Sequence, residues 1–203
     1  MLARRAVSAA SLAGTLAPGS LASLFGAQLS TITAAADPLT APTSLGGISM
    51  RVRDQSGAQR LARLLYVSPA QINFQVPPET SPGGLTITLV QSSGGNIATG
   101  GWVGPVAPGL FHSPNNTAAA TLTGDVATLY GTGFRNRSDL SKVTVDVSGV
   151  TLPVEYAGPE GSGIPGLDQV NVRLPVSLLA RGALEVSITV DGVRSNSTWL
   201  ELP

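Results

Sequence analysis

The sequence of 203 residues contains no cysteine, one histidine and one lysine, and charged residues make up only 12% of it. Without cysteine the chain cannot form a disulfide, a thiolate nucleophile or a cysteine-ligated metal centre. Twelve basic residues balance twelve acidic ones. The chain therefore lacks the basic surface of a general nucleic-acid-binding protein, and we expect no nucleic-acid partner. Low charge together with 42% hydrophobic residues also argues against a disordered chain.

Long apolar runs are missing too. No run approaches the ~18 residues that are needed to cross a bilayer, so we predict no integral membrane segment. Near the N-terminus, Arg4 and Arg5 precede a weakly hydrophobic stretch of mainly alanine and serine, residues 6–17. Residues 1–16 therefore have three interpretations: an ordered part of the first domain, a segment donated to a neighbouring molecule, or a short secretory signal.

Four blocks of sequence occur twice in the same order. Residues 21–29 correspond to 126–134, 66–69 to 156–159, 71–77 to 169–175, and 86–90 to 186–190. The offsets are 105, 90, 98 and 100 residues, so the two units are of nearly equal length. A period near 100 residues is typical of a single β-sandwich domain and too long for a solenoid repeat.

Hydrophobic and polar residues alternate within these blocks, as in a strand with one face in a core. Asp191-Gly192 predicts a tight hairpin turn. Only residues 175–181 suggest a helical turn. The predicted strands are residues 71–76, 85–91, 97–103, 143–147, 169–174, 184–190 and 193–202.

The sequence therefore predicts an all-β protein of two tandem immunoglobulin-like antiparallel β-sandwiches related by internal duplication. The expected boundaries are residues 1–106 for the first sandwich, 107–116 for a proline-rich linker and 117–203 for the second. Leu110 and Phe111 of the linker are predicted to lie between the two sandwiches.

Five blocks together resemble an uncharacterised C-terminal domain family of secreted proteins from Acidobacteria, especially Solibacter. The blocks are residues 17–26, 65–77, 107–111, 124–133 and 166–175, and the resemblance extends from about Val7 to Leu202. It implies an extracellular or cell-surface location, a domain of a longer polypeptide and kinship with IPT/TIG-type immunoglobulin-like sandwiches. It implies no catalytic residues. The chain departs from the family pattern at Ala70 and in the arginine-rich residues 51–63.

No motif indicates catalysis, so we predict a protein that is not an enzyme and needs no cofactor. His112 has only Ser113 beside it, and no G-x-S-x-G motif occurs. Residues 161–166 match G-x-G-x-x-G, but a strand pattern follows and Pro165 lacks an N–H. This match predicts a loop and not a phosphate-binding turn.

The acidic residues Glu155, Glu160 and Asp168 surround this glycine-rich loop. Calcium binding through loop oxygens stays open, although no calcium-loop motif is present. The favoured interpretation is structural: Asp168 accepts hydrogen bonds from N–H groups of the loop and fixes its path. We therefore predict no metal site.

The polar faces of the two repeated strands are the candidate ligand or partner surface. Planar amides on a flat strand suit hydroxyl-rich ligands such as an extracellular polysaccharide, which would also need an exposed aromatic platform. Trp102, Trp199, Tyr66, Tyr130 and Tyr156 are available, and equivalent positions favour a structural role for Tyr66 and Tyr156, with the ring in the core and the hydroxyl bonded to backbone. The candidate residues are Gln71, Asn73, Gln75, Gln169, Asn171 and Arg173.

The function that these patterns favour is a non-enzymatic extracellular module, acting as a spacer or adhesion domain of a secreted or cell-surface bacterial protein. One alternative is a self-assembling subunit of an extracellular β-sandwich filament or oligomer, joined through edge strands at residues 84–90 or 142–147, or through the N-terminal segment. The other is a polysaccharide-binding module.

Overall fold

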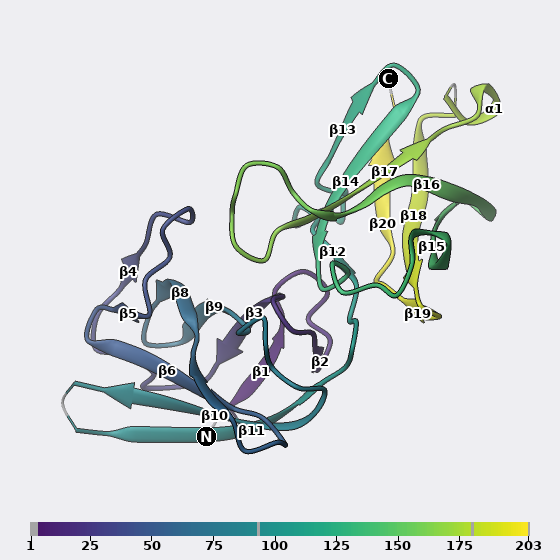
Figure 1. Cartoon of the computed structure of the whole chain (residues 1–203). Helices are drawn as coiled ribbons and strands as arrows, with labels where there is room; N and C mark the ends of the chain where they lie inside the picture. The colour runs from purple at the N-terminus through teal and green to yellow at the C-terminus, as the bar shows by residue number, and fades with distance from the viewer. Residues whose placement is uncertain (1–3, 93, 180, 203) are drawn as a thin grey trace.

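A computed structural model describes residues 4–92, 94–179 and 181–202. The chain is all-β, as predicted, with several antiparallel sheets and very little helix. Its buried hydrophobic residues form two clusters. One cluster contains residues from Ala6 to Val103, and the other contains residues from Val106 to Leu202. Figure 1 shows the corresponding halves of the chain as two neighbouring bodies.

The first half has a five-stranded and a six-stranded sheet, which enclose the first core. The five-stranded sheet has the order β1 (Arg5–Ser8), β3 (Leu21–Phe25), β9 (Gln71–Gln75), β8 (Arg63–Val67) and β4 (Ala34–Ala35). The six-stranded sheet contains β2 (Thr15–Leu16), β11 (Asn96–Val103), β10 (Gly83–Gln91), β6 (Ile48–Arg53) and β5 (Ser44–Leu45), with β7 (Gln59–Leu61) paired to β6.

The second half has a single nine-stranded sheet around the second core. Its main path is β12 (Gly109–Leu110), β14 (Val126–Thr132), β17 (Asp168–Arg173), β16 (Val150–Pro159), β15 (Val143–Val147), β18 (Ala183–Val190) and β19 (Val193–Arg194). β13 (Ala120–Thr123) pairs with β14, and β20 (Thr198–Glu201) pairs with β18. The helical turn is α1 (Val176–Leu179), and a 3-10 turn, η1 (Leu140–Lys142), precedes β15.

The two halves share one pairing register. Leu21 to Phe25 pair with Gln75 to Gln71, and Val126 to Tyr130 pair with Arg173 to Gln169 in the same way. A β-bulge interrupts the next ladder between Leu64 and Tyr66, and again between Val154 and Tyr156. The repeated sequence blocks therefore occupy matching places in matching ladders.

The strands suggested for self-association are inner strands, so that suggestion was wrong. β10 is paired on both sides, by β11 and β6, and β15 is paired on both sides, by β16 and β18. The N-terminal segment is also occupied, because β1 pairs with β3 of its own chain. The strands at the ends of the main sheet paths have only two to four residues, which offer little backbone for strand addition. β11 pairs with β2 only at Trp102 and Val103, so its residues 96–101 pair with β10 alone.

The segment expected as a linker folds largely with the second half. Gly109–Leu110 forms β12, and Leu110 lies in the second core and not between the halves as predicted. Phe111 is half-buried beside residues of the first half, where Leu21 and Asn73 line the same small cavity. The expected position of Phe111 therefore agrees with the structure, whereas that of Leu110 does not.

Thr132 joins the two halves directly. Its fully buried hydroxyl accepts from the Leu21 N–H at 2.8 Å and donates to the Gly166 carbonyl at 2.7 Å. The amide of Asn136 donates to the Pro18 carbonyl at 2.7 Å. A Cβ at Gly166 would lie 2.9 Å from the Gly19 carbonyl, so only glycine permits this close approach. The contact surface, here called the joint, is thus fixed by polar bonds and close packing.

Candidate ligand-binding site

The predicted polar face of the first half is largely occupied by contacts within the protein. Asn73 Oδ1 accepts from the Gln71 amide at 2.7 Å and from the Ser23 hydroxyl at 2.9 Å. Gln75 is buried and donates to the Gly19 carbonyl at 3.2 Å. Gln71 and Asn73 keep part of their surface in the small cavity that Phe111 also lines. The amide groups in this half therefore stabilise the fold and the joint.

The matching face of the second half behaves in a similar way. The Gln169 amide donates to Asn171 Oδ1 at 3.1 Å, which repeats the Gln71–Asn73 contact. Arg173 is exposed and forms ion pairs with Asp125 at 2.5 Å and Glu155 at 2.8 Å. The first pair holds the pKa of the Asp125 carboxyl below its usual value, through its hydrogen bond from Arg173. The six predicted residues thus lie on two separate surfaces, one in each half.

The carboxylates around the glycine-rich loop have separate partners. Glu155 pairs with Arg173, and Glu160 accepts from the Ser162 N–H at 2.8 Å. Asp168 is buried and accepts from Phe134 N–H and from Arg135, not from loop N–H groups as predicted. Within the described residues, no group of three or more histidine or acidic side chains could hold a metal ion.

Two further predicted residues are on the surface. The exposed His112 ring contacts the carbonyl of its neighbour Ser113 at 2.9 Å. Tyr156 donates from its hydroxyl to the Pro159 carbonyl at 2.7 Å, as expected of a structural tyrosine. Its ring is 37% exposed, however, so placing it in the core was wrong. A β-bulge lies just before this residue, between Val154 and Tyr156.

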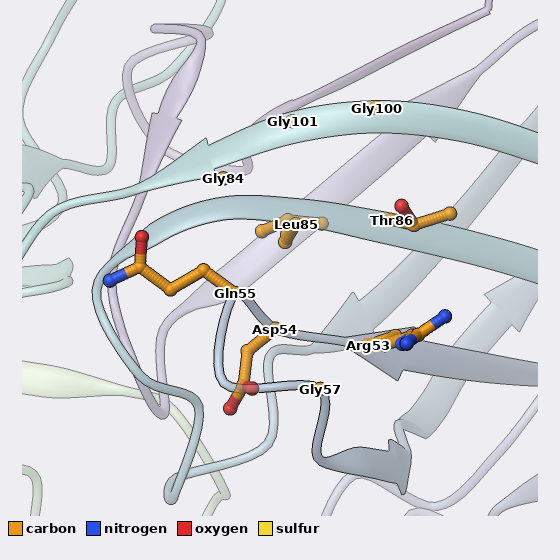
Figure 2. Close-up of a pocket in the computed structure, with 9 residues that line it drawn as sticks. All are labelled: Arg53, Asp54, Gln55, Gly57, Gly84, Leu85, Thr86, Gly100 and Gly101. Carbon is orange, nitrogen blue, oxygen red and sulfur yellow. The ribbon is translucent and has the colours of Figure 1, made fainter.

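A groove on the outer face of the six-stranded sheet has the features of a ligand site. It has a volume of about 430 Å³ and lies over β6, β10 and β11. Thr86 pairs with Gly100 on one side and with Arg53 on the other, so these three positions form one row across the sheet. Figure 2 shows the Thr86 and Arg53 side chains on neighbouring strands below the glycine-bearing strand. The hydroxyl of Thr86 and the guanidinium of Arg53 thus both line the groove.

Two glycines keep this groove open. A Cβ at Gly84 would have no heavy atom within 4 Å, and a Cβ at Gly100 would meet only the Leu85 carbonyl at 4.0 Å. Neither residue has the positive φ that favours glycine. Packing and backbone geometry therefore do not require glycine at these positions, although glycine weakens a strand by roughly 0.5–1 kcal/mol relative to alanine. A glycine inside a strand often marks a bulge, a bend or a site where a ligand or another backbone approaches closely.

Trp102 provides an aromatic surface at the end of the same sheet face. It pairs directly with Gly84, alternates outward with Gly100 along β11 and is 59% exposed. Trp199 of the second half is 44% exposed and lies across from Glu185 on β18. The sequence identified Trp102 as a possible platform but missed the groove. The available signal was the pair of glycine doublets, Gly83-Gly84 and Gly100-Gly101, inside two strands.

Asp54 fixes the turn at one edge of the groove. Its carboxylate accepts hydrogen bonds from Ser56, Ala58 and Ser81 and pairs with Arg60 at 3.1 Å. These bonds, led by the Ser56 hydroxyl, hold the pKa of the Asp54 carboxyl well below its usual value. Figure 2 shows the carboxylate turned away from the strands. Asp54 therefore shapes the groove without offering its charge to a ligand.

No protein-family model matches the sequence, and no curated protein matches it. Among solved structures, the chain is similar to a surface glycan-binding protein from the mixed-linkage glucan utilization locus of Bacteroides ovatus, determined with a mixed-linkage heptasaccharide. The identity is 15% and the TM-score 0.38, and the alignment covers 93% of this chain and 43% of that one. A likeness this weak carries no functional information. Within the described part of the chain, no helix is long and apolar enough to cross a membrane.

Proposed function

We propose that the protein is a non-enzymatic extracellular module, acting as a rigid spacer or adhesion domain of a secreted or cell-surface bacterial protein. The observation that carries this proposal is the joint, where the buried Thr132 hydroxyl accepts a hydrogen bond from Leu21 of the first half and donates one to Gly166 of its own half. A freely hinged pair would not bury a polar bridge of this kind, because its groups would lose their partners on each opening. The resemblance to secreted proteins of Acidobacteria supports the extracellular location.

Duplication of one immunoglobulin-like sandwich accounts for the two halves. It is supported by the shared ladder register and by the bulge that precedes both Tyr66 and Tyr156. Two such units in series make an elongated element. Arg5 pairs with Phe25, at the end of β3 opposite to the joint. Glu201 pairs with Ala183, at the end of β18 opposite to β19, and β19 itself lines a pocket together with Thr15 of the first half. A chain that passes through both units therefore runs along the length of the molecule.

The rigidity of the joint can be measured with spin labels at Thr88 and Glu185, one on each half. We expect a single narrow distance distribution by pulsed electron paramagnetic resonance. In T132V the distribution should broaden, because the Leu21 N–H and the Gly166 carbonyl lose their shared partner. A control variant, T123V, changes an exposed threonine of β13 and should keep the narrow distribution. A broad distribution in the unmodified protein would overturn the rigid spacer.

The groove supports a second candidate function, polysaccharide binding. A sugar ring could place its apolar face on Trp102 while its hydroxyls bond to Thr86 and Arg53. The two open glycines provide the space that a ring needs. This site differs from the predicted amide faces, whose side chains bond largely to one another.

Affinity electrophoresis in gels with soluble polysaccharides tests this candidate. A panel of hydroxyethyl cellulose, mixed-linkage β-glucan and laminarin should retard the protein in at least one gel. W102A and G100V should abolish retardation, because the first removes the platform and the second fills the hollow. The matched control is G161V, since Gly161 is also open but lies in the loop of the second half. Absence of retardation throughout the panel, or retardation that survives W102A, would reject the groove.

A further inference from the structure

A second cleft, at the joint, gathers three arginines. It has a volume of about 500 Å³ and is lined by Arg60, Arg63, Gln75 and Glu79 from the first half and by Arg135 and Pro165 from the second. The protein has only twelve basic residues, so this is a strong local concentration of guanidinium groups. Clefts between two packed units are common places for ligands.

Two of the guanidinium groups are held from behind by buried carboxylates. Arg60 Nη1 donates to Asp54 at 3.1 Å, and Arg135 Nε donates to Asp168 at 2.7 Å, while both acidic side chains are fully buried. Arg135 Nη2 also donates to the Leu167 carbonyl at 2.9 Å. The remaining N–H groups of Arg60 and Arg135 form no hydrogen bond among the described residues, and the two side chains are 32% and 19% exposed. Their positions are fixed in advance, so a ligand would lose little affinity to ordering them.

Arg63 provides the third group. It is exposed, it pairs across the ladder with Gln75, and it forms no ion pair among the residues that the structure describes. Glu79 is the one acid among the lining residues; its side chain is 72% exposed and lies 3.9 Å from Arg60. The carboxylates of Asp54 and Asp168 lie behind their arginines, so the surface that faces the cleft is cationic apart from Glu79.

We propose that this cleft binds an oxyanion, a carboxylate or sulfate group, through Arg60, Arg63 and Arg135. The planar guanidinium fork matches two oxygens of such a group and forms short charge-assisted hydrogen bonds. The oxyanion can be part of an acidic polysaccharide or a free inorganic ion. Because Arg60 and Arg63 come from one half and Arg135 from the other, a bound anion bridges the joint and tightens it. The site is independent of the sugar groove and goes beyond the proposed spacer role.

Isothermal titration calorimetry at low ionic strength tests the proposal, with potassium sulfate and oligogalacturonate as probes and potassium chloride as the blank. We expect R63A to weaken binding about ten-fold, which equals about 1.4 kcal/mol. E79Q should strengthen binding, by about two- to five-fold, because it removes the opposing charge. The control R181A removes an exposed arginine outside the cleft and should change nothing. Binding should weaken as salt is added.

The outcomes separate the two sources of the anion. Tighter binding of oligogalacturonate than of sulfate assigns the site to a polymer, and equal or tighter binding of sulfate assigns it to a free ion. Titration of W102A distinguishes this cleft from the groove, because that variant should bind both probes normally. Absence of binding by both probes at millimolar concentration, or binding that R63A and E79Q leave unchanged, would overturn the proposal.

Discussion

Gln75 and Arg173 occupy the same register position in the two halves, opposite Leu21 and Val126, yet their surroundings differ. Gln75 is buried at the joint and donates to the Gly19 carbonyl, whereas Arg173 is exposed and pairs with Asp125 and Glu155. The same end of this shared ladder is thus covered in the first half and free in the second. The residue type at this position matches its surroundings, since burying an amide with one hydrogen-bond partner costs less free energy than burying a charged guanidinium.

The halves also differ in how their two layers are connected. β16 runs without a break from its pairing with β15 to its pairing with β17, so the second half forms one sheet. In the first half the corresponding path breaks at Ala62 into β7, which pairs with β6, and β8, which pairs with β9. The break follows the turn that Asp54 organises, in the arginine-rich segment. This segment lines both the groove and the cleft, so the departure from the repeat is where both candidate sites lie.

The largest effect on stability is expected from substitutions at matched core residues. Leu24 and Leu129 occupy equivalent places in β3 and β14 and are each 1% exposed. We expect L24A and L129A each to lower the free energy of unfolding by about 2–5 kcal/mol, from lost burial and the cavity left behind. Hydrogen-exchange mass spectrometry should show most of the lost protection in the half that carries the change. Equal loss in both halves for each variant would contradict two separate cores.

The period of the hydrophobic pattern was sufficient to predict the inner strands. The alternation in residues 71–76 and 169–174 placed Phe74 and Val172 in the cores, where both are fully buried. Asp191-Gly192 forms the predicted turn, with φ values of 49° and 80°. These features depend on neighbours in sequence, so local patterns contain the information.

The joint and the two surface sites depend on contacts between distant residues. Thr132 bonds to Leu21 across 111 positions and to Gly166 across 34, which no local pattern indicates. The edge-strand prediction failed for the same reason, because composition does not show which strands have two neighbours. The alternation distinguished the amides from the apolar residues of each strand, but it did not indicate that Gln71 and Asn73 bond to each other or that Gln75 is buried.

A smaller effect is expected from breaking the joint. T132V removes a hydroxyl that serves both halves, and it leaves the Leu21 N–H and the Gly166 carbonyl without their partner. The loss should be about 1–3 kcal/mol, because two buried polar groups become unsatisfied. Protection against hydrogen exchange should fall at both β3 and the loop before β17, while T123V leaves both unchanged. Loss confined to one half would show that Thr132 supports its own core and not the joint.

The smallest expected effect is the change in stability at low pH, and it also distinguishes the two halves most sharply. In the first half, the bonds from Ser56 and its neighbours hold the pKa of the Asp54 carboxyl below the ordinary value of 3.8. Its contribution to stability is therefore present above that pH and is lost as the pH falls toward the pKa of the folded state. In the second half, burial raises the pKa of Asp168 above 3.8, despite the opposing charge of Arg135. Its folded state takes up a proton before the unfolded state does, so this residue favours folding more as the pH falls toward 3.8.

A fall from pH 5 to pH 3 should therefore lower the urea midpoint of the first half more than that of the second. Urea unfolding monitored by hydrogen exchange at the two pH values measures both midpoints. Asp125, Asp139 and Glu160 of the second half are half-buried or exposed, and their carboxyls have lowered pKa values. They reduce the difference in acid sensitivity between the halves, but solvent screens them strongly. D54N should remove much of the acid sensitivity of the first half, while D168N should make the second half more sensitive than before. An equal fall of both midpoints in the unmodified protein would contradict the opposite roles of these two buried carboxylates.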